Sequence, residues 1–98
     1  MIDHQGITSS SGVTLSWSEL TSITVYKIDA KIKVLTYLTF HHDSGDFLEF
    51  TNEDAEYQVI FNHLDSFIDL ADSWRNRIES LKPEEPLIQL WPLQTTSH

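Results

Sequence analysis

The chain contains no cysteine among its 98 residues. The fold therefore cannot depend on disulfides or thiolate-bound zinc, and a cysteine nucleophile is excluded. Glycine and proline are also scarce, with three residues of each, and there is no internal repeat or long low-complexity tract. No apolar run approaches the roughly 20 residues that cross a bilayer. The first residues carry neither a basic start nor an apolar stretch, so we expect no secretory signal and a cytoplasmic location.

Basic residues are few. Six Lys and Arg stand against fifteen Asp and Glu, which gives a formal net charge of −9. Because nucleic-acid binding usually needs a basic face to displace counterions from phosphates, we expect no nucleic-acid partner. One stretch without any Lys or Arg holds nine carboxylates: Asp43, Asp46, Glu49, Glu53, Asp54, Glu56, Asp65, Asp69 and Asp72. Such a stretch is typical of a solvated helix face with turns, or of an acidic surface for a basic partner.

The hydrophobic residues change their period halfway along the chain. From Val13 to Thr51 they mostly recur at every second position, and from Tyr57 to Leu81 at every third or fourth. The first pattern is typical of strands and the second of helices. We therefore predict a single α+β domain: a curved antiparallel sheet of about five strands, covered by one or two C-terminal helices. Residues 1–51 form the sheet half, 52–82 the helical half and 83–98 a C-terminal arm.

The pattern also places the individual elements. Strands are expected near 2–7, 13–17, 23–28, 32–40 and 47–51, and the fourth, which is apolar on both faces, is expected to be partly covered on each side. Thr51 or Asn52 is a candidate cap for the first helix. One helix over 53–81 would span about 40 Å, so a break is expected near 65–69, with Ser66 or Asp69 as the next cap. The predicted sheet–helix core is Val34, Leu38, Phe40, Phe50, Ile60, Phe61 and Leu64.

The segment around the second predicted strand resembles a known pattern. Gly6-Ile7-Thr8, a turn, Val13-Thr14-Leu15-Ser16 and then Trp17-Ser18-Glu19-Leu20-Thr21-Ser22-Ile23 are similar to the opening of small bacterial pleckstrin-homology-like (PH-like) domains. The chain also resembles short uncharacterised bacterial proteins in which a Lys-x-Asp element, here Lys27-Ile28-Asp29, precedes the helices. The resemblance implies a PH-like partial barrel, although the chain has fewer strands and one more helix than a full PH-like domain. Whether the sheet closes stays open.

The turn His41-His42-Asp43-Ser44-Gly45-Asp46 carries the residue types that ligate zinc, nickel or copper. Neighbouring residues of a strand point to opposite faces, so His41 and His42 are not expected to share an ion. We therefore predict no metal site and no cofactor. The chain also lacks Gly-x-Ser-x-Gly, a phosphate loop and His-Glu-x-x-His. No catalytic residue is predicted, and we do not expect an enzyme.

Two surfaces remain as candidate binding sites. Glu53 and Glu56 represent the acidic helix face, and Trp91, between two prolines on an expected edge strand at 87–91, is a candidate exposed anchor or a lid over the sheet. The leading prediction is a non-catalytic protein–protein interaction module, an acidic partner of a basic protein in the manner of small immunity proteins. The alternative is a small-ligand or lipid-headgroup module, whose anion site would be formed by Lys27, Lys31 and Lys33. A homodimer is compatible with either hypothesis.

Overall fold

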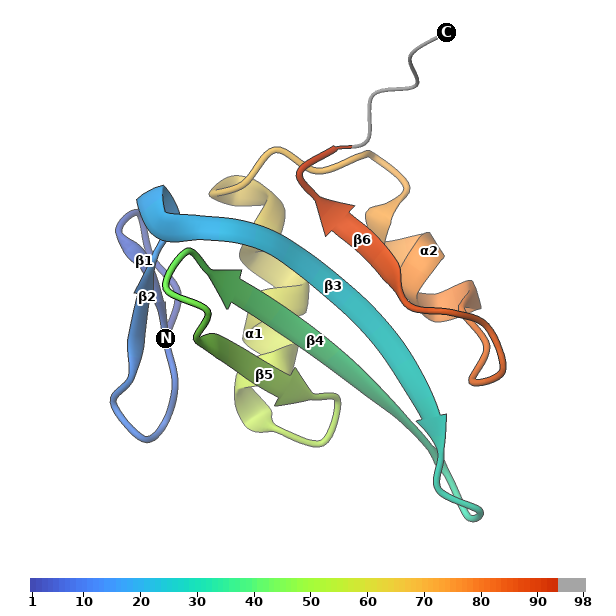
Figure 1. Ribbon diagram of the computed structural model, residues 1–98. Helices are drawn as coiled ribbons and strands as arrows, with labels where there is room; N and C mark the ends of the chain where they lie inside the picture. Colours follow the sequence, from blue (N-terminus) through green and yellow to red (C-terminus); the bar gives the residue numbers. More distant parts are fainter. Residues whose placement is uncertain (94–98) are drawn as a thin grey trace, which may run out of the picture.

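The structure, a computed structural model, describes residues 1–93 and contains two antiparallel sheets and two α-helices. The larger sheet has the order β5-β4-β3-β6 and the smaller one is the hairpin β1-β2 (Figure 1). The strands are β1 (Gly6–Thr8), β2 (Thr14–Ser16), β3 (Leu20–Asp29), β4 (Val34–His42), β5 (Phe47–Thr51) and β6 (Ile88–Trp91). The helices are α1 (Ala55–His63) and α2 (Trp74–Ser80). The predicted α+β class is therefore confirmed.

The first two strands do not join the main sheet. After β2 the chain enters a short 3-10 helix, η1 (Trp17–Glu19), where the Ser16 hydroxyl accepts a hydrogen bond from the Ser18 amide at 3.3 Å. This turn redirects the backbone before β3 begins, so the hairpin lies beside the four-stranded sheet. Both sheets are open within residues 1–93, and neither closes into a barrel.

A long hairpin, β3 and β4, forms the centre of the main sheet. Its turn is possible because Lys31 adopts a positive φ of 76° while its amide donates to the Asp29 carboxylate at 2.9 Å. Side chains two residues apart share a face, so the register pairs Ile23 with Phe40 and Val25 with Leu38 on the side that is buried.

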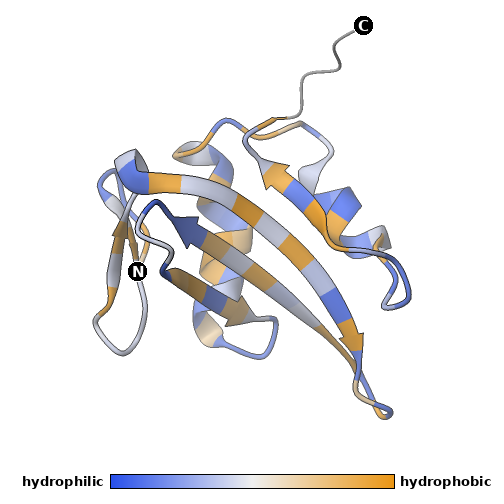
Figure 2. Cartoon of the chain, viewed as in Figure 1, coloured by the Kyte–Doolittle hydropathy of each residue, from blue (hydrophilic) through white to orange (hydrophobic). Residues whose placement is uncertain are grey.

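Both helices lie against one side of the main sheet (Figure 1). Figure 2 shows apolar residues recurring along its strands and on the helices. Of the predicted core residues, Phe61 is only partly buried. The prediction that Val34 belongs to the core is wrong, because Val34 is 42% exposed at the end of β4 that extends beyond the helices. The other predicted residues are buried: Leu38, Phe40, Phe50, Ile60 and Leu64.

The helical half is interrupted where the sequence predicts a break. The α1 helix ends at His63, a 3-10 turn η2 (Leu64–Ser66) follows, and α2 starts only at Trp74. The predicted caps are wrong. Asp54 and Ser73 occupy the N-cap positions. The Asn52 carboxamide accepts from the Thr36 amide of β4 and not from a helix amide.

The C-terminal segment returns to the sheet. The β6 strand pairs antiparallel with β3, as expected for an edge strand. The last residues of the predicted arm, 94–98, lie outside the described residues. Among residues 1–93, no helix is long and apolar enough to span a membrane.

Candidate functional site

One face of the main sheet carries no helix among the described residues. Alternation and register assign to it the side chains opposite the core: Thr24, Tyr26, Ile28, Leu35, Tyr37, Thr39, His41, Phe47 and Glu49. We call these nine residues the open face. The sequence predicted partial cover on both sides of β4, and the burial agrees, since Thr39 is 4% exposed and Tyr37 is partly buried on this face, although both helices pack on the other side.

Aromatic rings form the middle of the open face. Tyr26 and Tyr37 are cross-strand partners in β3 and β4, and their rings stack with centroids 4.9 Å apart and an interplanar angle of 7°. At the other end, the His41 ring lies 6.4 Å from the Phe47 ring, and its Nε2 atom is 3.0 Å from the Thr24 hydroxyl. Side chains locked in this way lose little rotamer freedom if a partner covers them.

A shallow hollow of about 350 Å³ lies on this face, lined by open-face residues and Leu87. Two apolar side chains that line it are largely in solvent, since Phe47 is 58% and Leu87 57% exposed. Apolar groups gathered around a hollow differ from single exposed residues, because a partner can remove the whole patch from water together.

Glu49 introduces the charge of the open face. Its Oε2 atom accepts hydrogen bonds from the Tyr26 hydroxyl at 2.9 Å and the Thr39 hydroxyl at 2.7 Å. Burial raises the pKa of Tyr26 to about 12, and the hydrogen bond to Glu49 and its charge act in the same direction. The Oε1 atom accepts no hydrogen bond from the described residues. The carboxylate is thus held in place with one oxygen still able to accept.

The three predicted lysines do not converge on one site. The Lys27 ammonium donates to the Glu79 carbonyl at the end of α2, at 3.2 Å, and lies in a cleft between the helices and the sheet. Lys33 forms an ion pair with Glu53, one of the predicted acidic residues. Lys31 lies in the β3–β4 turn, and its ammonium contacts no carboxylate among residues 1–93. A shared anion site would need these contacts to break.

The remaining predicted residues are also separate from one another. The Glu56 carboxylate lies 3.8 Å from the Met1 amino group. Trp91 is a cross-strand partner of Ile23 and is partly buried against the core. Glu53 is therefore paired with Lys33, and Trp91 packs against the core from the edge strand β6.

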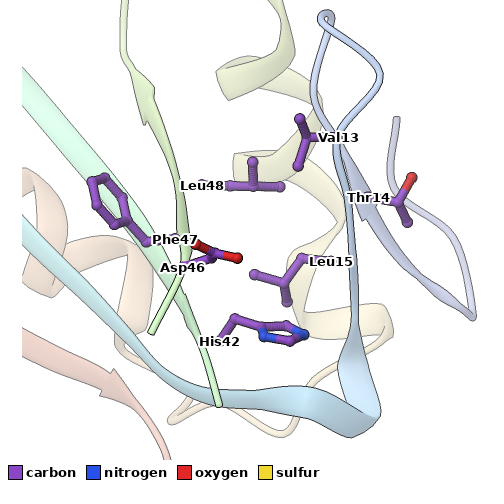
Figure 3. A pocket seen from close by; sticks show the side chains of 7 residues that line it. All are labelled: Val13, Thr14, Leu15, His42, Asp46, Phe47 and Leu48. Carbon is purple, nitrogen blue, oxygen red and sulfur yellow. The ribbon is translucent and has the colours of Figure 1, made fainter. Parts of the chain in front are cut away.

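A second hollow, of about 160 Å³, separates the hairpin from the main sheet. Figure 3 shows Leu15 of β2 and Leu48 of β5 pointing toward this space, and Thr14 pointing away. The His42 side chain lines the same space. The strands β2 and β5 are not paired, and the hollow lies where the hairpin and the main sheet remain separate.

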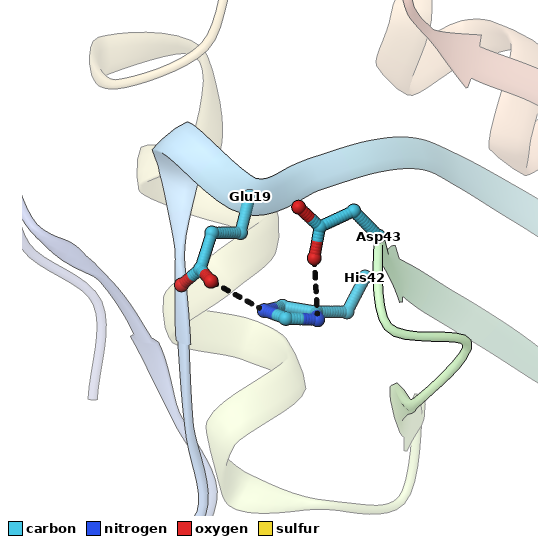
Figure 4. A group of neighbouring side chains, drawn as sticks. All are labelled: Glu19, His42 and Asp43. Carbon is cyan, nitrogen blue, oxygen red and sulfur yellow. Dashed lines mark ion pairs between the residues drawn. The ribbon is translucent and has the colours of Figure 1, made fainter.

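His42 also belongs to a group of titratable side chains. Its Nε2 atom is 3.4 Å from Glu19 Oε2, and its Nδ1 atom is 3.1 Å from Asp43 Oδ1 (Figure 4). One donor atom from each of the three residues lies within 4.8 Å of the others. His41 points to the open face instead, as strand alternation predicts. Glu19, from η1, lies far from His42 in the sequence, and no spacing in the sequence indicates that the two side chains meet.

No protein-family model, curated protein or solved structure matches this chain. The resemblance to PH-like bacterial proteins therefore stays a prediction, and the function must be argued from the geometry.

Proposed function

We propose that the protein is a non-catalytic interaction module whose open face binds a basic partner protein. The observation that carries this proposal is the position of Glu49, an oriented carboxylate surrounded by exposed apolar and aromatic side chains. Interfaces of this kind combine aromatic anchors with a few placed polar groups. A lysine or arginine of the partner would reach Oε1, while its apolar neighbours fill the hollow.

The charge of the chain supports a basic partner over a second copy. Two copies would each bring a net charge of −9 and, in a face-to-face dimer, a Glu49 carboxylate to the same interface. Like charges brought together at an interface are costly, whereas a basic partner is attracted at long range.

Exposed aromatic rings on a sheet also suit the stacking of nucleic-acid bases. Such sites need a positively charged groove that follows the backbone. On the open face, Glu49 supplies a negative charge, and none of the nine residues is Lys or Arg. The absence of a nucleic-acid partner thus remains our expectation.

The test begins with affinity capture from a lysate of the source cells. Each captured protein is then purified and titrated against the wild type, Phe47→Ser, Leu87→Ser and Glu49→Gln. Each substitution should weaken binding about tenfold, because it removes an anchor or the charge from the interface centre. Affinity should also fall as salt rises to 0.15 M, where screening acts over about 8 Å.

Val59→Ser is the matched control, because Val59 is an apolar residue of α1 with 47% exposure. It should leave binding unchanged. If the partner bound the three open-face variants with unchanged affinity but lost affinity on charge reversal at Glu53 and Glu56, the binding site would lie on the acidic helix face instead.

A further inference from the structure

We propose that the hollow of the open face is a pocket for one lysine side chain of the basic partner, and that it prefers lysine to arginine. This inference rests on the proposed function and narrows it to one residue type. The preference follows from the way in which Glu49 is held and from the apolar side chains around it.

Only one oxygen of the Glu49 carboxylate is available to a ligand. A carboxylate oxygen has two lone pairs, and Oε2 already accepts from the Tyr26 hydroxyl at 2.9 Å and from the Thr39 hydroxyl at 2.7 Å. No Lys, Arg or His among residues 1–93 forms an ion pair with Glu49. A ligand that enters the hollow therefore meets a single charged acceptor, Oε1, that has not been neutralised.

A single acceptor fits an ammonium better than a guanidinium. Arginine binds a carboxylate most strongly as a fork, with two parallel N–H groups that donate to the two oxygens. At Glu49 the second oxygen has no lone pair left for that arrangement. A lysine ammonium is a compact charge with three donors, so it needs only Oε1 to form a charge-assisted hydrogen bond.

The walls of the hollow suit the stem of a lysine. Its volume of about 350 Å³ is at the lower end of the range for ligand pockets, roughly 300–1,000 Å³, and so fits one side chain. Phe47 and Leu87 line it and are both more than half exposed. Lysine lays its methylene groups along apolar surface and keeps its charged head at a polar group. The stem would thus cover Phe47 and Leu87 while the ammonium reaches Glu49.

The test is an NMR titration of the ¹⁵N-labelled protein with three end-blocked pentapeptides, in which glycines surround a central lysine, arginine or norleucine. The lysine peptide should shift the amide signals of Phe47 and Glu49, with a dissociation constant in the millimolar range. Norleucine has the same four-carbon stem without the charge, so its peptide should bind about tenfold more weakly, because a hydrogen bond between charged groups is lost. The arginine peptide should bind at least about threefold more weakly than the lysine peptide.

Tyr26→Phe tests the reason for the preference. It keeps the ring and removes the hydroxyl that occupies one lone pair of Oε2, so the arginine peptide should gain affinity and the preference for lysine should shrink. Tyr37→Phe is the matched control, because Tyr37 is the stacked partner ring and its hydroxyl donates no hydrogen bond within residues 1–93. It should leave the preference unchanged. Glu49→Gln should reduce the affinity for the lysine peptide to that for the norleucine peptide.

Two results would overturn the lysine pocket: equal affinity for the lysine and arginine peptides, or no shift at Glu49 with the lysine peptide. The proposed function would still stand if the captured partner lost affinity on the three open-face substitutions. Conversely, the pocket would stand and the proposed partner binding would be wrong if the lysine peptide bound with the expected preference while those substitutions left the affinity of the captured partner unchanged.

Discussion

At the residue scale, Glu49 is the best-positioned polar group of the proposed interface. Two hydroxyl groups hold one of its oxygens, and the aromatic pair of Tyr26 and Tyr37 lies beside it. A partner would thus meet an oriented acceptor, which limits the entropy lost on binding.

The coupling of Glu49 to Tyr26 predicts a pH effect. The folded-state pKa of Tyr26 is about 12, above its ordinary value of 10. The neutral phenol therefore contributes stability that is fully present below pH 10 and is lost as the pH rises toward 12. Burial, the largest cause of the shift, is unchanged in Glu49→Gln, but the charge is removed, so the pKa of Tyr26 should fall part of the way toward 10 and this loss should shrink.

The measurement is an NMR titration of the tyrosine ring carbons in both proteins. Tyr57 is the internal control, because burial raises its pKa to about 12, with a smaller contribution from Glu79. If the Tyr26 pKa were the same with and without the Glu49 charge, the hydrogen bond between them would not exist in solution.

At the element scale, Arg75 joins the two helices. Its guanidinium donates to the Phe61 and Asn62 carbonyls at 2.9 and 3.1 Å, and to the Asp65 carboxylate at 3.1 and 3.3 Å. It also lies 4.4 Å from the centre of the Trp74 ring. One side chain of α2 thus satisfies carbonyls at the end of α1, where helices lack internal partners.

Arg75→Lys should therefore lower the free energy of unfolding by about 1–2 kcal/mol, because an ammonium cannot make the same planar set of hydrogen bonds. Urea denaturation measures the change. Arg77→Lys is the control: Arg77 is exposed, its side chain donates no hydrogen bond within residues 1–93, and a change below about 0.5 kcal/mol is expected. Equal effects of the two substitutions would contradict this role of Arg75.

Some elements could be predicted from the sequence because their signals are local. The alternation from Val13 to Thr51 and the helical period after Tyr57 depend on neighbouring residues, and the break near Asp65 follows from the size of the domain. The absence of an Asn52 cap could not be predicted, because the Asn52 carboxamide accepts a hydrogen bond from the Thr36 amide, sixteen residues away in the sequence.

The candidate sites depend on contacts that are distant in the sequence. Tyr26 and Glu49 are 23 residues apart, and the approach of Glu19 to His42 depends on the turn at η1. Periodicity shows that β4 is apolar on both faces, but it does not show which face the helices cover. The position of the exposed apolar patch could therefore not be predicted from the sequence alone.

At the scale of the whole molecule, the two faces of the main sheet differ. Both helices cover one face, while the other combines exposed apolar groups with a carboxylate in a chain of net charge −9. The β1–β2 hairpin lies beside the edge strand β5 and leaves the open face uncovered (Figure 1). This arrangement is the basis for the proposal that the protein binds a basic partner.

The most direct test is an amide chemical-shift map of the ¹⁵N-labelled protein bound to its captured partner. We predict that the largest shifts cluster on the open face, at Tyr26, Tyr37, Phe47 and Glu49, while α1 and α2 change little. Shifts centred on Glu53 and Glu56 at the start of α1, or on the Lys31 turn, with the open face unchanged, would contradict the account.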